Sequence, residues 1–163
     1  MKKYLIVLFL AAFLPSFVNA QEADRSTSTD YFGDWRLSCV EQGGEERCVV
    51  SQAQIDKSGA TVSVINVSKA EDALVIEFVL PLMTDLTTPV ELNISDNESQ
   101  SLPYNACNQS ACFILLTETG AVLEAFKANA SANMAFGLFN GQSVNVNISL
   151  RGFTAAHQAL SEK

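Results

Sequence analysis

The chain contains 163 residues, with 10 basic and 18 acidic side chains, and its net charge is −8. This length is typical of one ordinary domain that can bury a sizeable core. An acidic surface repels phosphate backbones and anionic lipid headgroups, and no cluster of Lys or Arg offsets that repulsion. The composition therefore argues against a nucleic-acid partner.

Residues 1–20 have the three zones of a secretory signal peptide. Lys2 and Lys3 begin the chain, an unbroken apolar run occupies residues 4–14, and Ala20 ends a short exit segment. The apolar run is too short for a transmembrane helix, and the short Lys-Lys start is typical of bacterial signals. We predict cleavage after Ala20 and export to the periplasm. Loss of Lys2 and Lys3 changes the net charge from −8 to −10, and no later stretch of the mature chain could span a membrane.

Residues 21–30 are polar and carry no large apolar side chain. We interpret them as a flexible leader and expect the ordered domain to comprise residues 31–163. No internal repeat and no linker long enough to divide two domains follows, so the sequence predicts a single domain.

Four cysteines in two close pairs are the strongest chemical signal of the chain. Cys39 and Cys48 are nine positions apart, and Cys107 and Cys112 are five apart. Both spacings occur between non-hydrogen-bonded partners of a tight hairpin, whose Cα atoms lie about 4.5 Å apart and allow a disulfide. Of the three possible connectivities, this geometry favours 39–48 with 107–112. A zinc site made of the four thiolates is the alternative, but the first pair is too widely spaced for a usual zinc knuckle and the compartment is oxidising.

The two predicted hairpins differ in the quality of their turns. The first centres on Gly-Gly at residues 43–44, which can adopt the positive φ angles of a two-residue turn. The same register places Leu37 opposite Val50 on the face of the cysteines. The second hairpin centres on Gln-Ser at residues 109–110, which is a weaker turn.

Most of the remaining chain has the patterns of strands. Alternation with a period of two predicts strands at residues 90–95 and 144–150, each with one face buried. Residues 73–80 are apolar nearly throughout, so we expect a central strand covered on both faces. In residues 61–67, Val62 and Val64 lie on the face opposite to Ile65 and Val67, and a bulge would reconcile the two sets.

The Asn140-Gly141 step resembles a two-residue turn, but the apolar pattern favours a longer loop. A three-residue loop from Phe139 to Gly141 pairs Phe136 with Val144, whereas a two-residue loop would pair it with Asn145. We therefore predict a type I turn with Gly141 in the left-handed conformation.

Two short helices complete the predicted fold. The first covers residues 120–128, with Thr119 as its cap and Val122, Leu123 and Phe126 on one face. The second covers residues 153–161, where Phe153, Ala156 and Leu160 are spaced at helical intervals. Many short strands with one or two short helices predict an all-β protein, an antiparallel β-sandwich.

The sequence contains no recognisable catalytic motif. Its single histidine, His157, lies on the second predicted helix, and we interpret it as a surface or packing residue. The carboxylates are scattered: Asp30 and Asp34 precede the first predicted strand, and Glu45 and Glu46 lie in the first hairpin. A paired-carboxylate hydrolase would need two such groups to converge in a cleft. We expect no enzymatic activity, no metal and no cofactor.

Two aromatic residues are candidates for contact with a partner. Trp35 shares a strand face with Leu37 and Cys39, so we interpret it as core, with recognition as the alternative. Phe139 falls in the predicted loop, where it would be an exposed apolar tip available to a partner; packing is the alternative.

These landmarks together resemble the invasion-associated locus B family of exported bacterial proteins. The resemblance rests on Trp35-Arg36-Leu37-Ser38-Cys39 followed by Cys48, on Cys107 and Cys112, and on the ending SLRGFTAAHQAL at residues 149–160. It covers nearly the whole mature chain and implies an envelope protein, in a family whose named member is linked to entry of a pathogen into red blood cells. The resemblance supplies no catalytic residue.

We therefore expect an exported, non-enzymatic protein that binds a protein partner in the envelope or on a host surface. It would stay in the periplasm, associate with the outer membrane or be secreted. A periplasmic chaperone-like or stress-related factor is the first alternative, which an exposed apolar groove or an unpaired sheet edge would favour. A carboxylate-dependent hydrolase is the second, which a pocket lined by two or more carboxylates would favour.

Overall fold

A computed structural model describes residues 26–70, 73–95, 98–117 and 119–163 of the chain. The predicted signal peptide and residues 21–25 of the predicted leader lie outside the described residues. The elements follow one another in this order: β1 (Ser26–Phe32), β2 (Trp35–Gln42), β3 (Glu45–Ile55), β4 (Thr61–Ala70), β5 (Ala73–Leu80), β6 (Val90–Ser95), β7 (Glu98–Leu102), β8 (Ala106–Cys107), β9 (Cys112–Leu116), α1 (Gly120–Ala128), β10 (Ser131–Gly137), β11 (Ser143–Ser149) and α2 (Phe153–Ser161).

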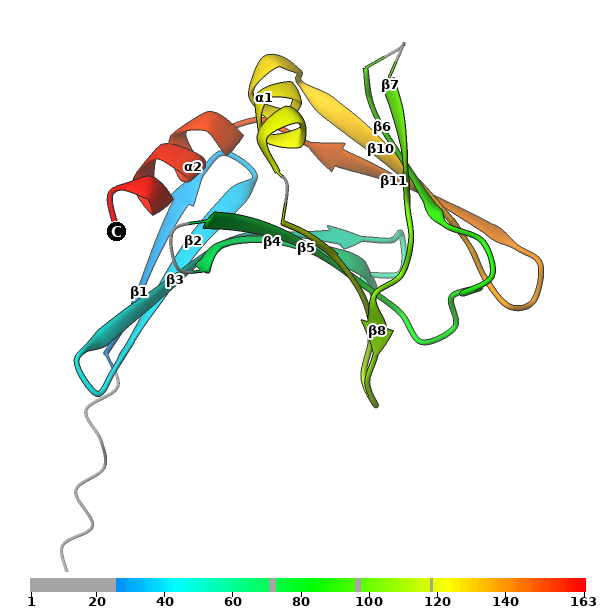
Figure 1. The fold of residues 1–163 in the computed structure, drawn as a ribbon, viewed down its shortest axis with the longest axis horizontal. Coiled ribbons are helices and arrows are strands. Elements are labelled where there is room, and N and C mark those ends of the chain that lie inside the picture. Colours follow the sequence, from blue (N-terminus) through cyan, green and yellow to red (C-terminus); the bar gives the residue numbers. More distant parts are fainter. Residues whose placement is uncertain (1–25, 71–72, 96–97, 118) are drawn as a thin grey trace, which may run out of the picture.

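Within the described residues the strands form two antiparallel sheets. The larger sheet has the order β1-β2-β3-β4-β5-β9-β8 and the smaller one the order β11-β10-β6-β7. The smaller sheet lies across part of one face of the larger sheet, and α1 and α2 lie beside it over the rest of that face (Figure 1). This architecture confirms the predicted all-β sandwich with two short helices. No helix among the described residues is long and apolar enough to cross a membrane.

The first strand corrects the predicted domain boundary. Residues 26–30, which we expected to belong to the leader, form most of β1 and pair with β2, with Ser26 opposite Glu41 and Phe32 opposite Trp35. β1 is an edge strand with exposed side chains. Its stability comes from backbone pairing with β2 and not from burial, so the apolar pattern that we used to find strands does not detect it.

The β2–β3 hairpin has the predicted register. Leu37 pairs with Val50 and Cys39 with Cys48. Both glycines of the two-residue loop, Gly43 and Gly44, have positive φ angles of 66° and 86°. This turn geometry matches the twist of the flanking strands.

The β4 and β5 strands differ from the prediction in detail. The register of β3 against β4 shifts between Gln54 and Ile55, which leaves Val62 as the bulged residue. Beyond the bulge, Ile65 and Val67 are buried while Val64 stays on the outer face. β5 is an inner strand of the larger sheet, but only one of its faces is fully buried, because the second layer covers one side of the sheet alone.

The last third of the chain follows the predicted pattern closely. Phe136 pairs with Val144, and the Leu138 N–H donates to the Gln142 carbonyl (2.7 Å) beyond the ends of the two strands. The loop between this last pair is therefore the predicted three residues, 139–141, with Gly141 at a φ of 81°. Both helices have the predicted bounds and buried faces. Thr119 precedes α1 but makes no capping hydrogen bond with its side chain, and its hydroxyl donates to the carbonyl of Leu74 instead (3.4 Å).

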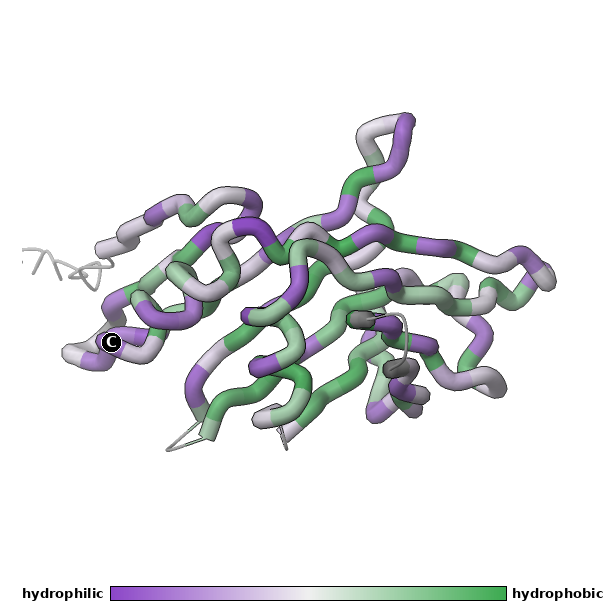
Figure 2. The backbone as a smooth tube through the Cα atoms, turned by 90° about the horizontal axis from the view of Figure 1, so that it is seen from above, coloured by the Kyte–Doolittle hydropathy of each residue, from purple (hydrophilic) through white to green (hydrophobic). Residues whose placement is uncertain are grey.

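The core fills the space between the larger sheet and the layer above it. Hydrophobic residues follow the inner parts of the strands, and hydrophilic residues occupy several outer turns (Figure 2). Trp35 is fully buried, as predicted, and its ring contacts that of Phe153 at the start of α2, with ring centroids 4.9 Å apart. Phe153 in turn contacts Phe126 of α1 (5.2 Å), so one aromatic cluster joins the larger sheet to both helices.

Candidate functional site

The four cysteines are all bonded in the predicted pairs. Cys39 is joined to Cys48 and Cys107 to Cys112, with Cα atoms 4.1 Å and 4.0 Å apart. Glu46 lies with Cys39 and Cys48 in a group whose potential ligand atoms are within 4.8 Å of one another. Because the two sulfur atoms are bonded to each other, neither is a thiolate that could bind zinc.

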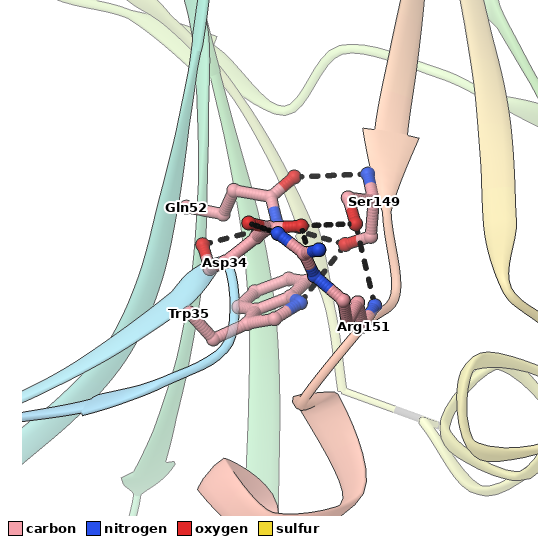
Figure 3. A network of polar contacts seen from close by, with 5 residues as sticks. All are labelled: Asp34, Trp35, Gln52, Ser149 and Arg151. Atoms are coloured by element: carbon pink, nitrogen blue, oxygen red, sulfur yellow. Dashed lines mark hydrogen bonds and ion pairs between the residues drawn. The ribbon is translucent and has the colours of Figure 1, made fainter.

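A polar cluster joins the two sheets beside Trp35 (Figure 3). The Arg151 guanidinium donates to both carboxylate oxygens of Asp34, from Nε at 3.1 Å and from Nη2 at 2.6 Å. The Ser149 hydroxyl also donates to Asp34 (2.6 Å), and the indole N–H of Trp35 donates to the Ser149 carbonyl (2.9 Å). The β1–β2 turn is thereby attached to the end of β11 and to the segment that leads into α2.

Gln52 of β3 extends this cluster into the space between the sheets. Its amide N–H group donates to the Ser149 carbonyl (2.7 Å), and its carbonyl oxygen accepts from the Ser149 backbone N–H (3.1 Å). The side chain of Gln54 donates to Gln52 (3.0 Å) and accepts from the Ser63 hydroxyl (2.7 Å). The three side chains of Gln52, Gln54 and Ser63 are buried, and each polar group has a partner, as buried polar groups require.

A groove of about 630 Å³ opens beside these residues, between β3 and β11. Asn145 and Asn147 lie on its β11 side, and Ile55 and Val62 contribute apolar surface on the other side. The lining residues are Asp34, Gln52, Ala53, Gln54, Ile55, Asp56, Val62, Val144, Asn145, Val146, Asn147 and Ser149.

The two carboxylates of the groove both have structural partners. Hydrogen bonds from Arg151 and Ser149 lower the pKa of Asp34. Hydrogen bonds from the Ser58 hydroxyl and from the backbone of Ala60 and Ser58 lower the pKa of Asp56, which closes its own turn. A general acid at neutral pH needs a raised pKa, so neither carboxyl group has the electrostatic environment of a glycosidase acid.

The other carboxylates that the sequence singled out do not converge. Glu45 pairs with Arg47 (3.2 Å) and Glu46 with Lys163 (3.3 Å), both at the surface. Asp30 is exposed on β1. His157 is half-buried on α2, where burial and then Lys127 lower its pKa against the opposing effect of Glu124.

Phe139 lies where the sequence predicted, at the exposed tip of the β10–β11 hairpin. Its side chain is 67% exposed. The loop between β5 and β6 runs alongside, because the Phe139 N–H donates to the Met83 carbonyl (2.9 Å) and the Asp85 N–H to the Gly137 carbonyl (2.9 Å). This loop carries further exposed apolar side chains, and we call the set the hairpin-tip patch: Leu82, Met83, Leu86 and Phe139.

Sequence reasoning missed the groove and most of the hairpin-tip patch. One signal was present for the groove: Gln52 and Gln54 continue the inward-facing positions of Cys48 and Val50 in β3. Polar residues on the buried face of a strand require partners. No comparable signal marks Leu82 and Met83, whose exposure depends on how the loop lies against β10.

Comparison with known proteins agrees with the fold and the landmarks. The chain matches the family model described as "Invasion associated locus B (IalB) protein" over residues 35–161. It is 28% identical over 150 residues to an invasion protein B homolog of Brucella abortus (strain 2308), covering 88% of this chain and 84% of that protein, and equally similar to the homolog of Brucella abortus biovar 1 (strain 9-941).

A solved structure has the same fold. The crystal structure of invasion associated protein B from Bartonella henselae superposes with a TM-score of 0.71 at 18% identity, covering 83% of this chain and 95% of that one. The family match begins at Trp35 and ends at the last residue of α2, so it includes both disulfides, the hairpin-tip patch and every residue that lines the groove except Asp34. The chain therefore belongs to the invasion associated locus B family.

Proposed function

We propose that this protein is exported to the periplasm and acts there or at the cell surface as a non-enzymatic binding protein, with the hairpin-tip patch as its contact surface. The observation that carries the proposal is the exposure of Phe139 beside Met83 on a backbone held by inter-loop hydrogen bonds. Exposed aromatic and Met side chains on a rigid frame are typical of protein interfaces. Two disulfides support export, because such bonds persist in oxidising compartments.

The names of the relatives suggest what kind of partner to test. The two Brucella proteins are called invasion protein B homologs, which makes a host-surface protein one candidate and an envelope protein the other. Asp34 and Asp56 each accept hydrogen bonds from structural partners, which supports a non-enzymatic role. If the wild-type protein turned over any member of a substrate panel and D34N or D56N did not, this role would be contradicted.

The patch is tested by site-specific photo-crosslinking in intact cells. A photoreactive phenylalanine replaces Phe139 in one strain and Leu115 in the control strain. Leu115 is an exposed apolar residue of β9 in the larger sheet. We expect one specific envelope or host protein to be captured from position 139 and not from 115. Equal capture at both positions, or none at either, contradicts the proposal.

A second measurement separates contact from folding. Phe139→Ser should reduce binding of the captured protein by about thirtyfold or more, since a central aromatic anchor is worth about 2 kcal/mol or more. Leu115→Ser should leave binding unchanged, and both variants should keep the wild-type melting temperature because both side chains are exposed.

The chaperone-like alternative has one observation in its favour. β11 is an edge strand that lies beside an open groove, and unpaired strand edges bind extended chains. Capture of many unfolded exported proteins by a photoreactive group placed at Asn145 of this edge would favour this alternative.

A further inference from the structure

The outer edge of β11 has free backbone groups at regular intervals. The Leu138 N–H donates to the Gln142 carbonyl (2.7 Å), and the Leu150 N–H donates to the Ala130 carbonyl (2.9 Å). Pairing alternates along an antiparallel ladder, so the even-numbered residues of β11 direct their N–H and C=O groups to β10. The odd-numbered residues, including Asn145, Asn147 and Ser149, direct theirs outward.

At Ser149 a side chain of the protein already pairs with this edge and indicates which kind of group the edge binds. The Gln52 carboxamide both donates to the Ser149 carbonyl (2.7 Å) and accepts from its N–H (3.1 Å). An amide therefore occupies the place that a peptide bond of a neighbouring strand would take. Asn147 and Asn145 are the next outward positions, and within the described part of the chain β11 pairs with β10 alone.

Both edges of the larger sheet carry features that discourage strand addition, whereas β11 does not. Charged residues, or a very short strand, protect an edge. β1 carries Asp30, and β8 has 2 residues. β11 has the sequence SVNVNIS, without a charge or a proline.

The groove beside β11 indicates what kind of segment fits. Among the described residues, its lining contains no Lys, Arg or His, and of its two carboxylates Asp34 is paired with Arg151 while Asp56 has no basic partner. The apolar side chains of Ile55 and Val62 face the space next to the edge. These features favour an extended peptide with alternating apolar side chains and a neutral or basic charge. Because the Gln52 carboxamide already pairs with the outward N–H and C=O groups of Ser149, the part of the edge that is open to a partner comprises residues 143–147.

We infer that β11 binds a short extended segment of another protein by strand addition, with that segment hydrogen-bonded to the outward backbone groups of Asn145 and Asn147. This inference deepens the proposed binding function and rests on it in one respect, that the partner is a protein. The binding surface differs from the hairpin-tip patch, because strand addition uses the backbone of β11 and requires no contact with Phe139.

The test uses a fluorescent seven-residue probe, Lys-Val-Thr-Val-Thr-Val-Lys, and its counterpart with Glu at both ends. Binding to the mature protein is followed by fluorescence anisotropy up to about 1 mM protein, a concentration that detects even weak complexes. We expect the basic probe to bind about tenfold or more tightly than the acidic one. Absence of binding by both probes, or equal binding, overturns the inference.

Substitution of Asn147 distinguishes backbone pairing from side-chain contact. Asn147→Pro removes the outward N–H and leaves the hydrogen bonds to β10 intact, since proline is tolerated where the N–H of an edge strand faces outward. We expect N147P to weaken binding about tenfold and the matched N147A to change it less than about twofold. If N147P lowers the melting temperature, N145P takes its place, with N145A as its control. Equal binding by the proline and alanine variants overturns the inference.

Amide hydrogen exchange locates the bound probe. Saturation with the basic probe should slow exchange at Asn145 and Asn147 by about tenfold or more, while Val146 and Ile148, already bonded to β10, change little. Unchanged exchange at Asn145 and Asn147 overturns strand addition even if the proposed patch at Phe139 is correct. Sedimentation of the free protein tests the rival occupant: a dimer that N147P dissociates would show that a second copy covers this edge.

Discussion

At the scale of single residues, Gly152 illustrates how one position joins distant parts of the chain. It precedes α2 with a φ of 87°, and a Cβ atom placed there would overlap the carbonyl oxygen of Phe32. Only a residue without a side chain permits the β1–β2 turn to lie this close to the start of α2. The Gly152-Phe153 step thus has a structural explanation. Gly152 permits the close approach, and the next residue, Phe153, packs in the aromatic cluster.

We predict that Gly152→Ala destabilises the protein by about 3 kcal/mol or more, as judged from urea unfolding. The positive φ alone costs about 1 kcal/mol, and the backbone clash adds the rest. Gly141→Ala is the matched control, because Gly141 has a φ of 81° and its added methyl group would meet no other segment within 4 Å. It should cost only about 1 kcal/mol. Equal losses of unfolding free energy in the two variants would contradict the close approach of Gly152 to Phe32.

At the scale of elements, each disulfide closes a short hairpin across neighbouring strands. The bonds join residues 9 and 5 positions apart, and closure of such loops restricts the unfolded chain. Replacement of either pair by alanines should therefore lower the free energy of unfolding by about 2–3 kcal/mol, with the larger loss for the Cys39–Cys48 pair because its loop is longer. Chemical denaturation with and without reductant measures both losses, and nonreducing peptide maps check the pairing. Peptides that join Cys39 to Cys107 or Cys112 would contradict the hairpin account.

At the scale of the whole molecule, stability depends on carboxylates that hold the turns and the sheet junction. The pKa values of Asp34, Asp56 and Asp85 are all lowered, mainly by hydrogen bonds from Arg151, Ser58 and Thr87 respectively. A pKa that is lower in the folded than in the unfolded state gives stability that is present above the ordinary value of 3.8 and is lost as the pH falls through the folded pKa. The urea midpoint should therefore fall steeply only below about pH 4.

The Asp34 contribution can be separated from the rest by substitution. Asp34→Asn should lower the urea midpoint at neutral pH and flatten its fall in acid, because the bond to Arg151 loses its charge. Asp30→Asn is the control, since Asp30 is an exposed carboxylate of β1. Identical acid profiles for D34N and the wild-type protein would show that Asp34 does not contribute.

Local patterns in the sequence determined much of the fold. The alternation of β6 and β11, the spacing of the cysteines, the three-residue loop that ends at Gly141 and the apolar faces of α1 and α2 each depend on residues that are near one another in the chain. Phe139 was found in the same way, because a loop predicted from register places its side chain outside the sheet. Short-range sterics and burial explain these successes.

Only the tertiary structure decided that the larger sheet begins with β1, and that a polar cluster and a groove form between the two sheets. β1 has no apolar pattern, and it is a strand because β2 lies beside it. Asp34 and Arg151 are 117 positions apart, and Gln52 has no sequence feature that reveals Ser149 as its partner. The groove and the free edge of β11 arise from the way in which the smaller sheet lies across the larger one. Such contacts between distant segments depend on the packing of whole layers, and no local periodicity records them.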